Sequence, residues 1–130
     1  MNRTQSEDRL VVLLNQASIF HWLSRPDCSP KHLSIGYWQA ARIHAILGNA
    51  AEARRHAEVC LSHSVGLELF YIAYAHEAMA RAAITAGDST LGAEHKRRAG
   101  AHAALVAKPG DRNALLKDLR TLGSTTDADA

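Results

Sequence analysis

The chain has 130 residues, of which 47% are hydrophobic and 22% are charged, so it fits one globular domain with its own core. The formal net charge of +2 does not match the strongly basic balance of a dedicated nucleic-acid-binding domain. The 24 alanines and an aromatic share of only 5% favour tightly packed helices over a sheet.

The first predicted helix follows Thr4, because Glu7 stands three residues later and completes a capping box. Pro26 ends this helix. Its apolar residues recur at helical spacing: they are Leu10, Leu13, Leu14, Ala17, Phe20 and Leu23. The second predicted helix begins where Pro30 follows a capping serine, and it continues to about Leu47.

Gly48 ends the second helix, and Asn49 is predicted to cap the third with Glu52 as its capping-box partner. A turn is predicted over 63–66. The buried stripe of the third helix consists of Ala50, Ala53, Ala57, Cys60 and Leu61. The fourth helix, about Leu67 to Ala86, is the most apolar one and is expected to be central.

The fifth predicted helix starts at the capping residue Asp88 and runs to about Val106. A short sixth helix is capped by Asp111 and ends near Leu122. The remaining residues, 123–130, are small and polar and are expected to be a disordered tail. No segment alternates with period two as a strand would, so the fold class is all-α.

An internal repeat is visible at two helix ends. Gly48-Asn49 and Gly87-Asp88 have the same pattern, a helix-terminating glycine followed by a capping residue, and they lie 39 residues apart. Superposing them pairs Ala41 with Ala80, Arg42 with Arg81, and His56 with His95. A fixed period of this size is typical of stacked helical hairpins.

The segment 41–61 resembles a tetratricopeptide repeat. It has small residues and a turn glycine where that family has them, at Ala41, Gly48, Ala53, Ala57 and Cys60. The second unit matches at Ala80, Gly87, Gly92 and Ala99, whereas Lys96 stands where a small or aromatic residue is expected. The closing proline is missing from both units, and the period exceeds the usual one of about 34 residues. The resemblance covers residues 33–106.

This resemblance implies a right-handed α-α superhelix of two hairpins, flanked by an N-terminal and a short C-terminal helix, within a single domain over residues 1–122. Two hairpins alone cannot bury both ends of the stack. The first and sixth helices are therefore expected to act as caps. In the alternative, one end pairs with another copy and gives a homodimer.

In proteins of this family, the first helix of each hairpin lines a concave groove. The matching positions are Ile35, Trp38, Arg42 and Ala45, followed by Tyr74, Glu77, Arg81 and Thr85. Independently of the family, Glu77, Arg81 and Thr85 form a polar stripe on an apolar helix. Tryptophan and arginine are enriched at binding hot spots.

The predicted function is therefore a non-catalytic binding or scaffold module that captures a protein segment or a small acidic ligand. Its predicted binding site consists of Trp38, Arg42, Tyr74, Glu77 and Arg81. The alternative interpretation of this cluster is structural. In that case Glu77 pairs with Arg81 or Arg42 across a helix interface, and Trp38 fills the core.

No metal site or cofactor is predicted. Helical ligands should lie three or four residues apart, and no two of the eight histidines do. His76-Glu77 begins like a zincin motif, but Ala80 stands at the position of the second histidine. Neither Cys28 nor Cys60 has an evident base for nucleophilic catalysis.

One enzyme alternative remains. Arg97 and His102 are separated by four residues, as in the arginine-histidine pattern of the all-helical HEPN ribonucleases. The resemblance implies that arginine stabilises phosphate charge and histidine acts as acid or base. The repeat interpretation instead makes the run 96–98 a solvated outer face.

Nucleic-acid binding through Arg54, Arg55 and the run 96–98 is not expected. Acidic residues are interspersed among these basic residues, which favours a solvated charged face. The acidic residues are Glu52, Glu58 and Glu94.

A cytoplasmic location without membrane contact is expected. Glu7 and Asp8 interrupt the layout of a signal peptide. The uncharged stretch 69–74 is too short to span a bilayer. The two cysteines form neither a disulfide framework nor a redox motif.

Overall fold

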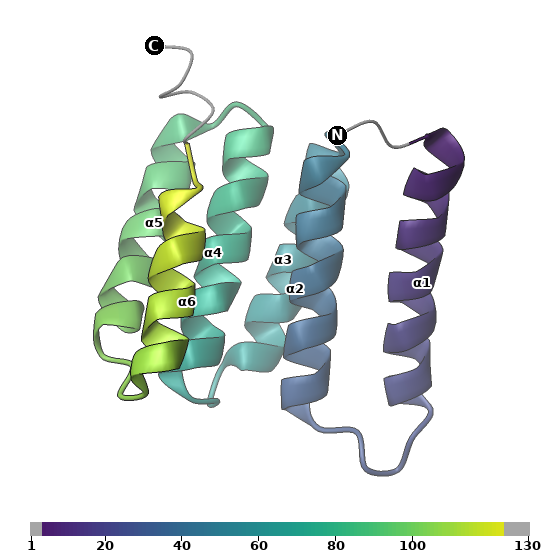
Figure 1. Cartoon of the computed structure of the whole chain (residues 1–130), viewed down its shortest axis with the longest axis horizontal. Helices are drawn as coiled ribbons and strands as arrows, with labels where there is room; N and C mark the ends of the chain where they lie inside the picture. The colour runs from purple at the N-terminus through teal and green to yellow at the C-terminus, as the bar shows by residue number, and fades with distance from the viewer. Residues whose placement is uncertain (1–3, 124–130) are drawn as a thin grey trace.

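The computed structural model describes residues 4–123, and over that range the chain is all-helical without a strand (Figure 1). Its elements are α1 (Gln5–Leu23), α2 (Pro30–Ile46), α3 (Ala50–Ser64), α4 (Leu69–Thr85), α5 (Ser89–Ala104) and α6 (Pro109–Arg120). The all-α prediction is confirmed. The expected disordered tail lies outside the described residues, apart from Gly123.

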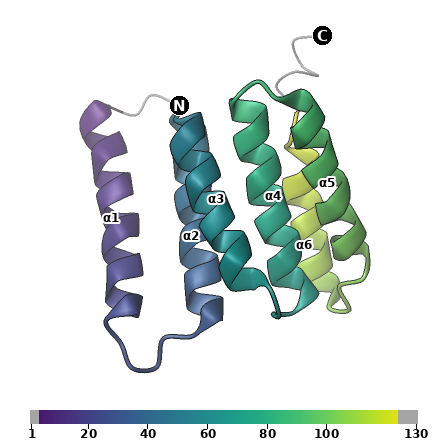
Figure 2. The same cartoon turned by 180° about the vertical axis from the view of Figure 1, so that it is seen from behind.

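The helices form two antiparallel hairpins, α2–α3 and α4–α5, that lie side by side (Figures 1 and 2). The hairpins are joined through α4, which packs against both α2 and α3. At one end of the molecule α1 packs on α2, and at the other end α6 packs on α4 and α5. The view in Figure 2 has α3 and α5 in front and α6 behind.

The two turns at Gly48 and Gly87 have the same backbone geometry. Both glycines adopt a left-handed conformation, with φ of 80° and 83°, which residues with a side chain rarely adopt. After Gly48, the Asn49 N–H donates to His44 O at 2.8 Å, and after Gly87 the equivalent N–H of Asp88 donates at 2.9 Å. These bonds satisfy carbonyls that the helix ends would leave unpaired. The predicted repeat of 39 residues is thus a repeat of local structure.

Of the predicted capping interactions, those of α1 and α5 are confirmed and that of α3 is wrong. Thr4 and Glu7 form the reciprocal capping box, with hydrogen bonds of 2.9 and 3.1 Å. Asp88 accepts the N–H of Leu91 at 3.0 Å. The predicted box at Asn49 is not formed: the asparagine side chain makes no capping hydrogen bond. Its intended partner Glu52 instead binds Arg55 on the same helix, because a guanidinium one turn away offers a stronger, charge-assisted bond.

Two predicted boundaries shift. The helix α6 begins at Pro109, two residues before the predicted cap Asp111, because proline is well suited to the first helical position. Its N-cap is Lys108, whose side chain makes no capping bond. The helix α3 continues through Ser64, into the segment predicted as a turn. That serine donates to the carbonyl of Cys60 at 2.7 Å inside the last turn.

Small side chains allow the close helix packing that the composition predicted. The α3 residues Ala53, Ala57 and Cys60 are fully buried, as expected from their spacing. The helix α4 is buried along most of its length, which confirms its central position. Where α6 closes the second hairpin, larger residues complete the core: Leu115, Leu119 and Leu122.

The helix α1 departs most clearly from expectation. An amphipathic helix normally buries its apolar stripe, but here Leu10, Leu13, Leu14, Phe20 and Leu23 are all exposed. The face that packs on α2 is instead formed around Asn15 and Ile19. Asn15 donates through Nδ2 to Gly36 O at 3.2 Å. A Cβ atom at Gly36 would lie 3.0 Å from Ile19 Cγ1, so this glycine permits the close approach.

Among the helices described, none is both long enough and apolar enough to cross a membrane.

Candidate functional site

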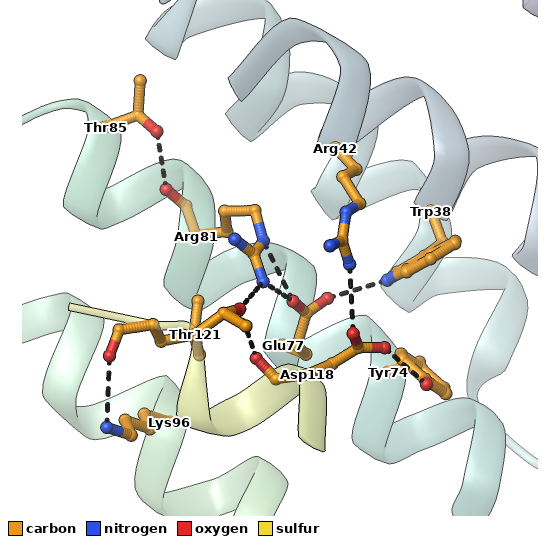
Figure 3. A network of polar contacts seen from close by, with 10 residues as sticks. Trp38, Arg42, Tyr74, Glu77, Arg81, Thr85, Lys96, Asp118 and Thr121 are labelled. Carbon is orange, nitrogen blue, oxygen red and sulfur yellow. Dashed lines mark hydrogen bonds and ion pairs between the residues drawn. The ribbon is translucent and has the colours of Figure 1, made fainter. Parts of the chain in front are cut away.

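The five predicted site residues come together where α2 faces α4 (Figure 3). Trp38 and Arg42 lie one turn apart on α2. Tyr74, Glu77 and Arg81 follow at steps of three and four along α4, and therefore share one face. The hairpin repeat places these two helices side by side, so residues from distant parts of the sequence meet.

Glu77 is the centre of the polar network. Its side chain is fully buried. One carboxylate oxygen accepts the indole N–H of Trp38 at 2.8 Å. The other accepts Nε and Nη2 of Arg81 at 3.0 and 2.6 Å. A buried carboxylate is tolerated when it is paired and hydrogen-bonded in this way. Glu77 thus pairs with Arg81 within α4 and not across a helix interface, whereas its bond from Trp38 joins α4 to α2.

Two residues that the sequence did not identify join the network: Asp118 of α6, and Thr121, the C-cap residue of that helix (Figure 3). Tyr74 donates its hydroxyl to Asp118 Oδ2 at 2.7 Å, and Arg42 Nη1 lies 3.5 Å from Asp118 Oδ1. Arg81 Nη2 donates to Thr121 Oγ1 at 2.8 Å. Burial raises the pKa of Tyr74, and the hydrogen bond to Asp118 raises it further, so the phenol keeps its proton and remains the donor.

No sequence signal marked Asp118 or Thr121 as site residues. Both lie on the edge of α6 that faces α2 and α4, next to the leucines that α6 buries. The spacing of Leu115, Leu119 and Leu122 could have indicated that edge, because position 118 lies one turn from two of them. It could not have shown which helix the edge would contact.

Arg42 differs from Arg81 in how much of its bonding capacity is used. Its guanidinium carbon lies 5.5 Å from the ring centroid of Trp38, and its one ion pair, with Asp118, is long. The Arg42 side chain is 31% exposed to solvent. Since arginine offers five N–H donors in a planar fork, Arg42 has donors left for an incoming carboxylate.

An aromatic hollow of about 280 Å³ lies beside this network. Its lining consists of Ser34, Ile35, Trp38, Phe70, Tyr71 and Tyr74. The rings of Trp38 and Phe70 each meet Tyr74 edge-on, with centroids 5.1 Å apart. Sequence reasoning missed Phe70 and Tyr71, although both lie one helical turn before Tyr74 on the same helix.

The remaining predicted groove positions lie on the far side of the network. A smaller hollow of about 180 Å³ is lined in part by Ala45, Arg81 and Thr85. The Thr85 hydroxyl donates to Arg81 O at 2.9 Å, so its hydrogen bond is made within α4. The network across α2, α4 and α6 therefore lies between the aromatic hollow and a smaller hollow of mixed polarity.

Two histidines, His76 and His95, are buried inside the α4–α5 hairpin. In α4–α5, His76 Nδ1 lies 3.0 Å from His95 Nδ1, and the ring of His76 stacks on His102 with centroids 5.7 Å apart. Burial lowers the pKa of His76 to about 4, and His95, His102 and Arg98 lower it further. Over residues 4–123, no three His, Cys, Asp or Glu side chains are grouped to hold a metal ion.

The ribonuclease candidates Arg97 and His102 do not converge. Five residues along a helix turn the side chains by about 140°. Arg97 binds Glu94 at 2.5 Å on the exposed side of α5. His102 stacks on His76 within the hairpin.

The basic residues considered for nucleic-acid binding are ion-paired on their own helices. The pairs are Arg54 with Glu58, Arg55 with Glu52, and Arg97 and Arg98 with Glu94. Lys96 instead donates to the carbonyl of Leu122 at 3.4 Å. The acidic partners lower the positive potential that phosphate contacts would require.

Comparison of the chain with protein-family models, with curated proteins and with solved structures gave no match.

Proposed function

We propose that this protein is a non-catalytic binding module, built as a tetratricopeptide-like right-handed stack, that captures a segment of another protein between α2 and α4. The observation that supports this most is the open aromatic hollow beside Arg42. Trp38 borders both features: its ring lines the hollow and lies beneath the guanidinium of Arg42. Rigid aromatic walls next to an incompletely paired arginine are typical of binding hot spots.

The proposed ligand segment has an apolar side chain followed by an acidic one. The apolar side chain enters the hollow, where ring edges and the exposed Ile35 offer contact area at a small cost in conformational entropy. The acidic group binds Arg42 through two parallel N–H···O bonds and replaces the long contact to Asp118. A small acidic ligand would use the same arginine.

The five site residues then divide into two roles. Trp38, Arg42 and Tyr74 contact the ligand, since they border the hollow or keep free donors. Glu77 and Arg81 hold the groove in shape, because their bonds are already formed with Trp38 and Thr121. Loss of Arg81 alone would leave the buried charge of Glu77 uncompensated.

A peptide selection tests the proposal. Random peptides are selected on the immobilised full chain, and the affinity of the enriched sequences is measured by fluorescence polarisation. Ile35→Asp and Arg42→Glu should each weaken binding by about tenfold or more. Val65→Asp is the matched control, because Val65 is exposed between α3 and α4, outside the groove.

Two results would count against the groove. One is an enriched peptide whose affinity is the same for Ile35→Asp and Arg42→Glu as for the unaltered protein. The other is the absence of any acidic-apolar peptide among the enriched sequences.

The ribonuclease alternative gains no support from the positions of Arg97 and His102. We retain the cytoplasmic location as part of the proposal, because Cys28 and Cys60 are both free thiols, which fits a reducing compartment.

A further inference from the structure

The outer side of α1 carries a continuous apolar stripe, here called the leucine face: Leu10, Leu13, Leu14, Ala17 and Phe20. Leu13 and Leu14 are each 60% exposed and Phe20 is 71% exposed. The stripe lies on the side opposite Asn15 and Ile19, which face α2. None of its five side chains is charged.

The position of α1 in the stack indicates that the leucine face lacks a covering helix. In the two hairpins, the second helices α3 and α5 are covered by the first helices α2 and α4. The helix α1 precedes α2 as α3 precedes α4, so it occupies the place of a second helix, and no first helix covers it among residues 4–123. Among the described residues, α2 is the helix against which α1 packs. A terminal helix that acted as a cap would present a polar outer face.

Hollows lie on both sides of α1. One of about 540 Å³ is lined in part by Val12, Leu13 and His44. The other, of about 410 Å³, is lined in part by Val11 and Leu14. Apolar surface therefore extends around α1 toward α2 on both sides, and a helix lying along the leucine face would shield its edges.

We propose that two copies of this chain pair through their leucine faces, with the two α1 helices antiparallel about a two-fold axis. The stripe is self-complementary in this arrangement, since it is centred near residue 15. Leu13 lies opposite the small Ala17 of the second copy, and Leu10 lies opposite its Phe20. Antiparallel pairing also reproduces the geometry within each hairpin, where a second helix is covered by an antiparallel neighbour.

The area available suits a dimer of this kind. With Val11 and Leu23 at its edges, the exposed apolar side chains offer on the order of 100 Å² each, or roughly 600 Å² per chain. A symmetric pair would bury about 1,200 Å², the lower end of specific interfaces. The five side chains of the leucine face are uncharged, so pairing removes no charge of this face from water.

The mass of the full chain in solution tests the proposal. Light scattering and sedimentation equilibrium should give twice the chain mass of 14.1 kDa, with a transition to monomer on dilution between about 100 and 1 μM. Leu13→Glu should weaken association on the order of 100-fold or more, because the symmetry places two charges in the interface. The matched control is Leu105→Glu, since Leu105 is 70% exposed beyond α5; this variant should remain dimeric.

A monomer of the unaltered chain over the whole range would overturn the proposal, as would open-ended aggregation or a folded Leu13→Glu variant that dimerises normally. Far-ultraviolet circular dichroism shows whether each variant is folded. If Leu13→Glu does not fold, Phe20→Glu replaces it. The melting temperature of the unaltered chain, which should rise with protein concentration, gives a reading that needs no variant.

Discussion

The terminal helices pack differently at the two ends of the helical stack. The C-terminal end, at α6, is called the closed end here, and the N-terminal end, at α1, is called the open end. At the C-terminal end, α6 buries Leu115 and Leu119 against α4 and α5, and it fixes its edge with Asp118 and Thr121. At the N-terminal end, α1 turns a polar residue, Asn15, toward its neighbour and leaves its leucines in solvent.

This difference shows that helical periodicity does not reveal which side of a helix is buried. Both α1 and α6 carry leucines at helical spacing, and each is a terminal helix. Only α6 directs its leucines into the chain's own core. An apolar stripe predicts that something will cover it, and the covering element can be another molecule.

The largest effect on stability should come from breaking the ion pair between Arg81 and the buried Glu77. Arg81→Ala leaves the buried Glu77 without its charge partner, and should lower the unfolding free energy by about 3–5 kcal/mol. Urea denaturation followed by circular dichroism measures this loss. Arg55→Ala removes the exposed partner of Glu52 and should leave stability unchanged. Similar results for the two variants would contradict the role assigned to Glu77.

A matched leucine pair sharpens the contrast between the two ends. Leu115→Ala opens a cavity in the α4–α5–α6 core and should cost about 2–5 kcal/mol of unfolding free energy. Leu13→Ala removes an exposed side chain, and should cost less than about 0.5 kcal/mol in dilute solution, where the copies do not associate. The same denaturation measurement applies. Equal losses would show that α1 is buried more than the structure indicates.

Acid should weaken the hairpin at the closed end. Because the pKa of His76 is lowered to about 4 in the folded chain, the unfolded chain takes up a proton first as the pH falls. The stability contributed here is present above pH 6.5 and is lost toward pH 4. Between pH 7 and pH 5 the unfolding free energy should fall by on the order of 2 kcal/mol more than in His76→Gln. A His76→Gln variant with an unchanged pH dependence would disprove this origin.

The smallest effect should come from the polar contact at the open end. Asn15→Ala removes the buried hydrogen bond to Gly36 O, and should cost about 1 kcal/mol. Hydrogen exchange should become faster in α1 while amides in α4 remain protected, because the loss is local to one terminal helix. Faster exchange across both hairpins would show that α1 supports the whole stack.

Local features of the fold were predictable from the sequence. The turns at Gly48 and Gly87, the capping box at Thr4 and the buried alanines of α3 all depend on residues within one or two helical turns of each other. Asn49 is the N-cap residue of α3 as expected, but its side chain makes no capping bond, and Glu52, its expected capping-box partner, binds Arg55 instead.

The site was predictable in part. The repeat aligned α2 with α4, and so the sequence brought together Trp38, Glu77 and Arg81. It did not reveal Asp118, because the direction in which α6 returns across α4 depends on tertiary packing. For the same reason the sequence did not show that α1 exposes its leucines.

The most direct test of the groove places a photo-crosslinking amino acid at Ile35 in the full chain, and at Val65 as the control, in the cells that produce the protein. Ile35 borders the aromatic hollow, whereas Val65 is exposed and does not line it. The groove proposal predicts crosslinks from position 35 to one defined segment of a partner protein, and none to that segment from position 65. Identical products from both positions, or no product from position 35, would contradict it.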